Sequence, residues 1–146
     1  MKILKSVLFL LFGVLLLLTP RPAQVASYLW QGTNTDWFNA ANWKPNGVPG
    51  PGDSVEIYNS TFWAGNNPNN AAGEIQDLTI GACNGIELGG TLMVKGSFNF
   101  NNGELRGGTL VLDAGATMNF NYTTPCQDGC THGWLMKLPR LGIFWR

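Results

Sequence analysis

The sequence contains little charge and almost no histidine. Of its 146 residues only 12% are charged, nine basic and nine acidic, and Lys and Arg form no run. Nucleic-acid-binding domains carry clustered basic residues, so this composition argues against nucleic acid as a partner. The single histidine, His132, lies near the end of the chain. A catalytic triad or a multi-histidine metal site in the body of the chain would therefore lack its usual base or ligand.

Cysteine is also scarce, with Cys83, Cys126 and Cys130 as the only three. An odd number leaves one thiol over if a disulfide forms. Cys126, Cys130 and His132 supply three ligands where zinc takes four. A Cys126–Cys130 disulfide or free thiols are therefore favoured over a zinc site.

One long hydrophobic run is present, and it stands at the N-terminus. Lys2 and Lys5 precede an apolar stretch over residues 7–18, and Thr19-Pro20 follows it. A spanning helix needs about 20 apolar residues, so this shorter run favours a signal peptide over residues 1–27. The sequence thus predicts an extracellular protein, secreted or held at the cell surface, with no stable membrane span after cleavage. Removal of the segment leaves six basic and nine acidic residues, a net charge of −3.

Sustained helical periodicity is absent from residue 28 onward, and short runs alternate apolar and polar residues between glycine, asparagine and proline. This pattern predicts an all-β domain. The segment 89–94, Gly-Gly-Thr-Leu-Met-Val, returns at 107–112 as Gly-Gly-Thr-Leu-Val-Leu. Phe98-Asn99-Phe100 returns as Met118-Asn119-Phe120, and Leu78-Thr79-Ile80 precedes Phe98-Asn99-Phe100 by the same spacing.

Repeats of about 20 residues, built from short strands and glycine corners, are typical of solenoids. We therefore expect a short single-stranded right-handed parallel β-helix, with a β-sandwich as the alternative. Stacked coils would place Thr79, Asn99 and Asn119 in one outward ladder. The alternating apolar positions of the repeats would point inward: Leu78, Ile80, Leu92, Val94, Phe98, Phe100, Leu110, Leu112, Met118 and Phe120.

The expected organisation is a signal peptide over 1–27, a Trp/Asn/Gly/Pro-rich cap over 28–70, β-helix coils over 71–123 and a C-terminal tail over 124–146. The tail breaks the repeat, so it is either a second cap or a foreign end. A solenoid this short needs caps, because its ends expose unpaired strand edges. An uncapped end favours edge-to-edge self-association. Trp30, Trp37 and Trp43 are expected to be buried in the first cap.

The cap carries an ordered pattern: Trp30-x-Gly32, then Trp37, Asn42-Trp43, Pro49 and Gly52-Asp53 before Val55-x-Ile57. The pattern resembles the opening segment of secreted β-helix proteins of the bacterial cell-surface and autotransporter-associated kind, in which Gly-rich strand repeats follow. A weaker similarity is to G8-type extracellular domains. The resemblance covers about residues 29–120. It implies a β-helix exposed at the cell surface, and it implies no reaction, because such solenoids serve as stalks, adhesins and glycan-active domains alike.

Glu87 and Glu104 are the strongest catalytic candidates, because the dipeptide Glu87-Leu88 recurs as Glu104-Leu105 at nearly the spacing of the repeat. Stacked on adjacent coils they would lie about 5 Å apart, the spacing of neighbouring strands and of a retaining glycosidase pair. Two adjacent like charges destabilise a sheet unless a cation or a proton lies between them. Ca²⁺, Lys95 or Arg106 could supply the positive charge, or the two side chains could point in slightly different directions. Two solvated glutamates are the favoured interpretation, since the sequence shows no cleft.

Other candidate ligand groups are isolated. Trp63, in a Gly- and Asn-rich stretch, is the best candidate to stack on a sugar ring. Asp36, Asp53 and Glu56 carry oxygen ligands of the kind Ca²⁺ takes, without EF-hand spacing, and Asp53 is expected to fix a turn. No resident cofactor is predicted, Ca²⁺ being the one ion these carboxylates suit. Asn59 and Asn121 each begin an N-x-Ser/Thr acceptor pattern for glycosylation, or match it by chance in an Asn-rich chain.

Together these features predict a structural or adhesive module that binds a cell-surface glycan or protein and catalyses no reaction. The runner-up is a polysaccharide-active glycosidase or lyase that uses Glu87 and Glu104. A third interpretation is a truncated fragment of a larger surface protein.

Overall fold

The computed structural model describes residues 25–32, 34–58, 67–81, 84–101 and 103–121, and the backbone of 142–145. Within these residues the protein is all-β, as expected, with one short 3₁₀ turn. The elements are β1 (Ser27–Trp30), η1 (Ala40–Asn42), β2 (Trp43–Lys44), β3 (Ser54–Ile57), β4 (Ala71–Ile75), β5 (Asp77–Ile80), β6 (Gly85–Val94), β7 (Ser97–Phe100), β8 (Glu104–Leu112), β9 (Thr117–Phe120) and β10 (Gly142–Trp145).

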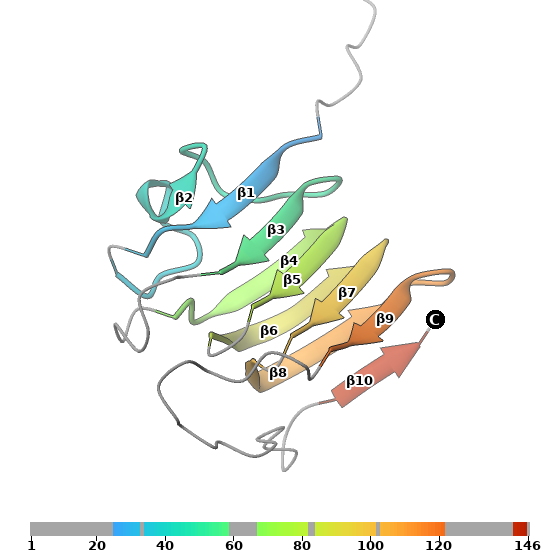
Figure 1. Ribbon diagram of the computed structural model, residues 1–146. Helices are drawn as coiled ribbons and strands as arrows, with labels where there is room; N and C mark the ends of the chain where they lie inside the picture. Colours follow the sequence, from blue (N-terminus) through green and yellow to red (C-terminus); the bar gives the residue numbers. More distant parts are fainter. Residues whose placement is uncertain are drawn as a thin grey trace, which may run out of the picture.

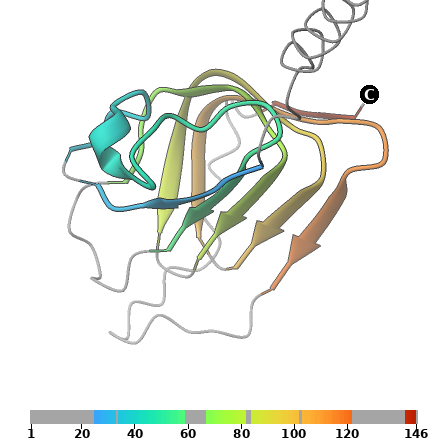
Figure 2. The same ribbon diagram turned by 90° about the horizontal axis from the view of Figure 1, so that it is seen from above.

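The strands form two sheets that lie face to face (Figures 1 and 2). The first has the order β2-β1-β3-β5-β7-β9, and the second has the order β10-β8-β6-β4. From β3 to β9 the chain crosses from one sheet to the other at each step, and every pairing among these strands is parallel. The antiparallel pair is β1 with β2.

The first sheet follows the spacing of the predicted repeat without a shift. Leu78 pairs with Phe98, and Phe98 pairs with Met118. Thr79, Asn99 and Asn119 occupy consecutive positions in the next column. This ladder was predicted from the repeat and is confirmed.

The second sheet departs from a constant spacing. Thr91 pairs with Thr109, as the Gly-Gly-Thr-Leu repeat predicts, but the same spacing does not hold for Gly85, which pairs with Glu104. The register shifts between Leu88 and Thr91. Gly108 lies at this irregularity with φ +38°, and a Cβ there would clash with the Gly90 carbonyl oxygen. Only glycine fits a left-handed position that lies against the backbone of the neighbouring strand.

The core fills the space between the two sheets. Eight of the ten predicted core residues are buried: Leu78, Ile80, Leu92, Val94, Phe98, Phe100, Leu110 and Leu112. The expectation is wrong for Phe120, whose side chain is 41% exposed, and Met118 is half-buried. Both lie on β9, the outermost strand of the first sheet, where an inward side chain has a neighbouring strand on one side in the described part of the chain.

The opening region contributes strands to the first sheet. β1 and β3 pair in parallel with one another, and β3 pairs with β5. Trp30, Trp37 and Trp43 are buried, as predicted. The Trp43 ring contacts both other tryptophans edge-on, and its Nε1 donates a 2.8 Å hydrogen bond to the Trp37 carbonyl oxygen.

Part of the tail also joins a sheet. β10 pairs in parallel with β8, with Phe144 opposite Val111. It therefore occupies the outer edge of the second sheet, where the sequence indicated the need for a cap. No helix in the described residues is both long and apolar enough to cross a bilayer.

Candidate functional site

Glu87 and Glu104 do not form the predicted pair. β6 and β8 place Glu104 opposite Gly85, and Glu87 opposite Arg106. Arg106 forms an ion pair with Glu104. The prediction aligned the two Glu-Leu dipeptides with one another, whereas the shifted register moves the second dipeptide towards the start of β6. Of the cations considered from the sequence, Arg106 contacts Glu104 and lies opposite Glu87, so the two glutamates do not occupy directly opposed positions on β6 and β8.

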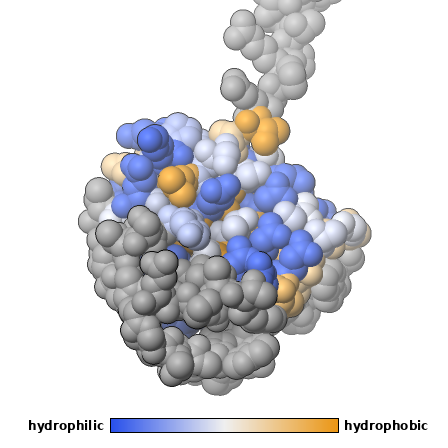
Figure 3. Space-filling model, viewed as in Figure 1, coloured by the Kyte–Doolittle hydropathy of each residue, from blue (hydrophilic) through white to orange (hydrophobic). Residues whose placement is uncertain are grey.

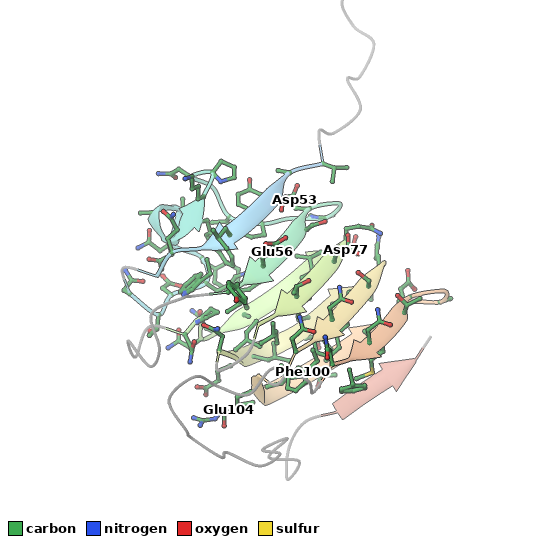
Figure 4. The ribbon with its side chains drawn as sticks, viewed as in Figure 1. Asp53, Glu56, Asp77, Phe100 and Glu104 are labelled. Carbon is green, nitrogen blue, oxygen red and sulfur yellow. The ribbon has the colours of Figure 1, made fainter. Side chains whose placement is uncertain are left out.

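The two glutamates do line one hollow of about 220 Å³. Its walls come from the loop before η1, the segment that leads into β4, and the first residues of β6 and β8: Thr35, Asn67, Pro68, Asn69, Gly85, Ile86, Glu87, Glu104 and Arg106. Figure 4 shows Glu104 at the start of β8, apart from Asp53, Glu56 and Asp77. We call this feature the glutamate hollow.

Backbone hydrogen bonds tie the walls of the glutamate hollow together. The Asn69 amide donates to the Thr35 carbonyl oxygen at 2.7 Å, and the Glu87 amide donates to the Pro68 carbonyl oxygen at 2.9 Å. A parallel bridge joins Asp36 to Asn69. These contacts hold the backbone segments around the hollow in place relative to one another.

The three acidic residues considered for Ca²⁺ have separate roles. Asp53 accepts hydrogen bonds from the amides of Gly50 and Ala26, at 2.9 and 3.0 Å, and so fixes the turn before β3, as expected. Asp36 accepts from the Phe38 amide and from the Asn70 side chain. Glu56 is exposed on β3. Within the described ranges, no three His, Cys, Asp or Glu residues lie close enough to hold a metal ion.

The outer surface of the first sheet carries a second arrangement of polar groups. Two rows of side chains run across β3, β5, β7 and β9, which we call the ladder face: Ser54, Asp77, Ser97 and Thr117 in one row, and Glu56, Thr79, Asn99 and Asn119 in the other. Figure 3 shows hydrophilic residues gathered on this side, and Figure 4 shows Glu56 and Asp77 on neighbouring strands of it.

Hydrogen bonds connect three neighbouring strands in each row of the ladder face. The side-chain amide of Asn119 donates to Asn99 Oδ1 at 2.9 Å, and the side-chain amide of Asn99 donates to Thr79 Oγ1 at 3.3 Å. In the other row, the Ser54 hydroxyl donates to Asp77 Oδ2, and the Ser97 hydroxyl and backbone amide donate to Asp77 Oδ1, each at 2.8 Å. Six of the eight side chains of the ladder face are therefore oriented by hydrogen bonds to a neighbouring strand.

Asp77 is the central acceptor of its row. Partial burial by itself raises the pKa of Asp77, but the hydrogen bonds from Ser54 and Ser97 favour the carboxylate and outweigh it, so the net pKa lies below the ordinary value. Asp77 is not among the candidate residues expected from the sequence. Extending the alignment of Leu78 with Phe98 and Met118 by one position would have placed it with Ser97 and Thr117.

Comparison of the chain with protein-family models, with curated proteins and with solved structures gave no match.

Several sequence candidates lie outside the described residues: Trp63, Asn59, Cys126 and Cys130. Asn121 follows β9, and its side chain is exposed. Its backbone amide donates to the Phe100 carbonyl oxygen at 2.9 Å. Its role as a glycosylation acceptor stays a prediction.

Proposed function

We propose that this protein is a secreted or cell-surface module, structural or adhesive and without catalytic activity, that binds a neutral polysaccharide along the ladder face. In this proposal the two sheets are the faces of a short right-handed parallel β-helix. The parallel pairing and the strict alternation between sheets support this, since sandwiches pair their strands mostly antiparallel. The N-terminal apolar run after Lys2 and Lys5 supports export.

The observation that carries the proposal is the hydrogen-bonded ladder face. Neighbouring strands lie about 4.8 Å apart, so each row presents a regular series of polar groups. Side chains that already have fixed orientations lose less conformational entropy when they bind a ligand. A regular and rigid polar surface suits an extended polymer whose own polar groups repeat.

The chemistry of the ladder face favours a neutral polymer rich in hydroxyl groups. Its eight side chains are hydroxyls, amides and two carboxylates, Glu56 and Asp77, with no cation among them. Hydroxyls and amides both donate and accept, and carboxylates accept. An anionic polymer would meet two like charges, whereas sugar hydroxyls can donate to both carboxylates.

A catalytic role lacks geometric support. Hydrolysis by a carboxylate pair requires two opposed carboxyl groups with a defined separation. The structure instead places Arg106 in contact with Glu104 and opposite Glu87. Both glutamates are thus better explained as charged walls of the hollow than as an acid and a nucleophile.

The test is to incubate the purified protein with a panel of soluble and insoluble polysaccharides and to measure two quantities together. The first is depletion of protein from solution, and the second is release of reducing or unsaturated ends. We expect saturable depletion by at least one neutral polysaccharide and no product. Product formation that disappears in Glu87→Gln and Glu104→Gln would replace the proposal with the enzymatic alternative. Folded protein that shows neither depletion nor product would exclude polysaccharide binding along the ladder face.

A further inference from the structure

The glutamate hollow contains polar groups that the fold does not use. Among the described residues, the side chains of Thr35, Asn67 and Asn69 make no hydrogen bond, and Glu87 makes no ion pair. A hydroxyl, two amides and a carboxylate thus converge on one small space with their donors and acceptors available. Such convergence of a few polar groups on a concave surface is typical of small-ligand sites.

The surface that the hollow offers to a ligand is mainly polar. Pro68 and Ile86 are buried, and Ile86 packs in the core, while Asn67 and Glu87 are exposed. A ligand that fits must therefore present hydrogen-bonding groups to this lining. A sugar ring, with hydroxyls around its periphery, meets this requirement.

The net charge of the hollow indicates which kind of sugar it would bind. Glu104 and Arg106 neutralise one another in their ion pair, so Glu87 leaves a net charge of −1. A carboxylate forms stronger hydrogen bonds with a cationic donor than with a neutral one. The hollow therefore favours a sugar that carries an ammonium group over one that carries hydroxyl groups only.

We propose that the glutamate hollow binds a single hexosamine unit with a free amine, its ammonium group against Glu87 and its hydroxyls against Asn67, Asn69 and Glu104. The backbone hydrogen bonds that join these walls hold the site open in advance. This inference rests on the proposed function for the class of ligand, and it names a site distinct from the ladder face.

The test is a titration of the purified protein with glucosamine, N-acetylglucosamine and glucose, followed by amide chemical shifts in two-dimensional NMR. We expect glucosamine to bind about three- to fivefold more tightly than N-acetylglucosamine, the range of an exposed ion pair, with the difference shrinking at high salt. The shifted signals should belong to Gly85, Glu87 and the side-chain amides of Asn67 and Asn69.

Two variants test whether the charge of Glu87 causes the preference for glucosamine. Glu87→Gln keeps the shape of the side chain and removes its charge, so it should abolish the preference for glucosamine. Asp113→Asn removes a carboxylate that follows the end of β8 farthest from the hollow and lies outside the ladder face, so it should leave the preference intact. A preference that survives in Glu87→Gln, an absence of saturable shifts with every sugar, or equal binding of Nα-acetyl-lysine amide would each overturn the proposed sugar site.

These outcomes are separable from the test of the proposed function. If polysaccharide depletion persists and hexosamine titrations show no binding, the hollow is not a sugar site and the ladder face remains the binding surface. If hexosamine binds at the hollow and no polysaccharide depletes the protein, the ladder face has no glycan role.

Discussion

At the scale of single residues, Asp77 does the most to join neighbouring strands. Its carboxylate accepts hydrogen bonds from Ser54 on β3 and from Ser97 on β7, so one side chain connects three strands. Hydrogen bonds to a charged group contribute more to stability than neutral ones do. The charge of Asp77 should therefore be visible in the stability of the whole domain.

The first prediction concerns pH. Because the folded pKa of Asp77 lies below its ordinary value of 3.8, its contribution is complete above that value and is lost as pH falls through the folded pKa. Asp77→Asn should lower the free energy of unfolding by about 1–2 kcal/mol at neutral pH. The cost should shrink as pH falls through the folded pKa of Asp77, because the wild-type carboxyl then becomes protonated as well. Urea denaturation at a series of pH values measures both effects.

Glu56→Gln is the matched control, because Glu56 lies on the same face and is exposed. Its substitution should leave the acid dependence close to that of the wild type. If the free energy of unfolding depends on pH in the same way for Asp77→Asn and Glu56→Gln, the hydrogen bonds of Asp77 do not stabilise the fold.

The second prediction concerns the buried tryptophans. Trp43→Ala removes three ring contacts, with Tyr28, Trp30 and Trp37, and leaves the Trp37 carbonyl oxygen without its Nε1 donor. Truncation of a buried aromatic residue costs about 3–5 kcal/mol. Phe38→Ala, at a position 51% exposed, should cost less than about 0.5 kcal/mol. Thermal unfolding followed by tryptophan fluorescence compares the stability of the two variants. Similar losses of stability would show that the tryptophan cluster does not unfold together with the rest of the domain.

At the scale of elements, the two sheets differ in how far the sequence predicts them. Phe98-Asn99-Phe100 and Met118-Asn119-Phe120 align at a constant spacing because β5, β7 and β9 pair without interruption. A bulge interrupts β6 and β8. Bulges insert a residue into one strand of a pair, and here the offset between paired residues changes from 18 at Thr91–Thr109 to 19 at Glu87–Arg106. The identical dipeptides Glu87-Leu88 and Glu104-Leu105 lie only 17 residues apart, so matching them by identity aligned Glu87 with the wrong residue of β8.

The third prediction tests this bulge through its glycine. Gly108→Ala would force a Cβ into the Gly90 carbonyl oxygen and the Leu88 side chain at a left-handed position. Gly115 is also left-handed, with φ +85°, but a Cβ there meets nothing within 4 Å. Backbone strain alone costs about 1 kcal/mol at such a position. Gly115→Ala should therefore be mild, and Gly108→Ala should reduce stability several-fold more.

Denaturation followed by circular dichroism measures the stability of both glycine variants. Equal losses in Gly108→Ala and Gly115→Ala would mean that β6 and β8 do not approach as closely at the bulge as the structure shows.

At the scale of the whole molecule, the sequence predicts those features of the fold that depend on the repeat and on the alternation of apolar and polar residues. All-β character, the burial of Leu78 and Phe98, and the Thr79–Asn99–Asn119 ladder all follow from period-two alternation and a regular repeat. The glutamate hollow could not be predicted in this way. Its walls join Thr35, Asn67 and Glu104 from segments that share no periodicity and meet only after the sheets have formed.

The position of the opening region could not be predicted from the sequence pattern either. The Trp-rich segment was expected as a separate cap over 28–70, yet β1 and β3 continue the first sheet. Val55-x-Ile57 alternates as β5 does, but the loops before it carry no repeat that would align it with Leu78 and Ile80. The pairing is decided by burial, since Val55 and Ile57 complete the core at that end of the stack.

The most direct test of the account is a binding isotherm on the polysaccharide that depletes the wild-type protein, measured for an Asn99→Ala/Asn119→Ala double variant. Each lost hydrogen-bonding side chain removes about 0.5–1.5 kcal/mol, so we expect affinity to fall roughly tenfold or more. Thr91→Ala, an exposed change on the second sheet, should leave affinity unchanged. A folded double variant that binds as tightly as Thr91→Ala would contradict the claim that the ladder face binds the polymer.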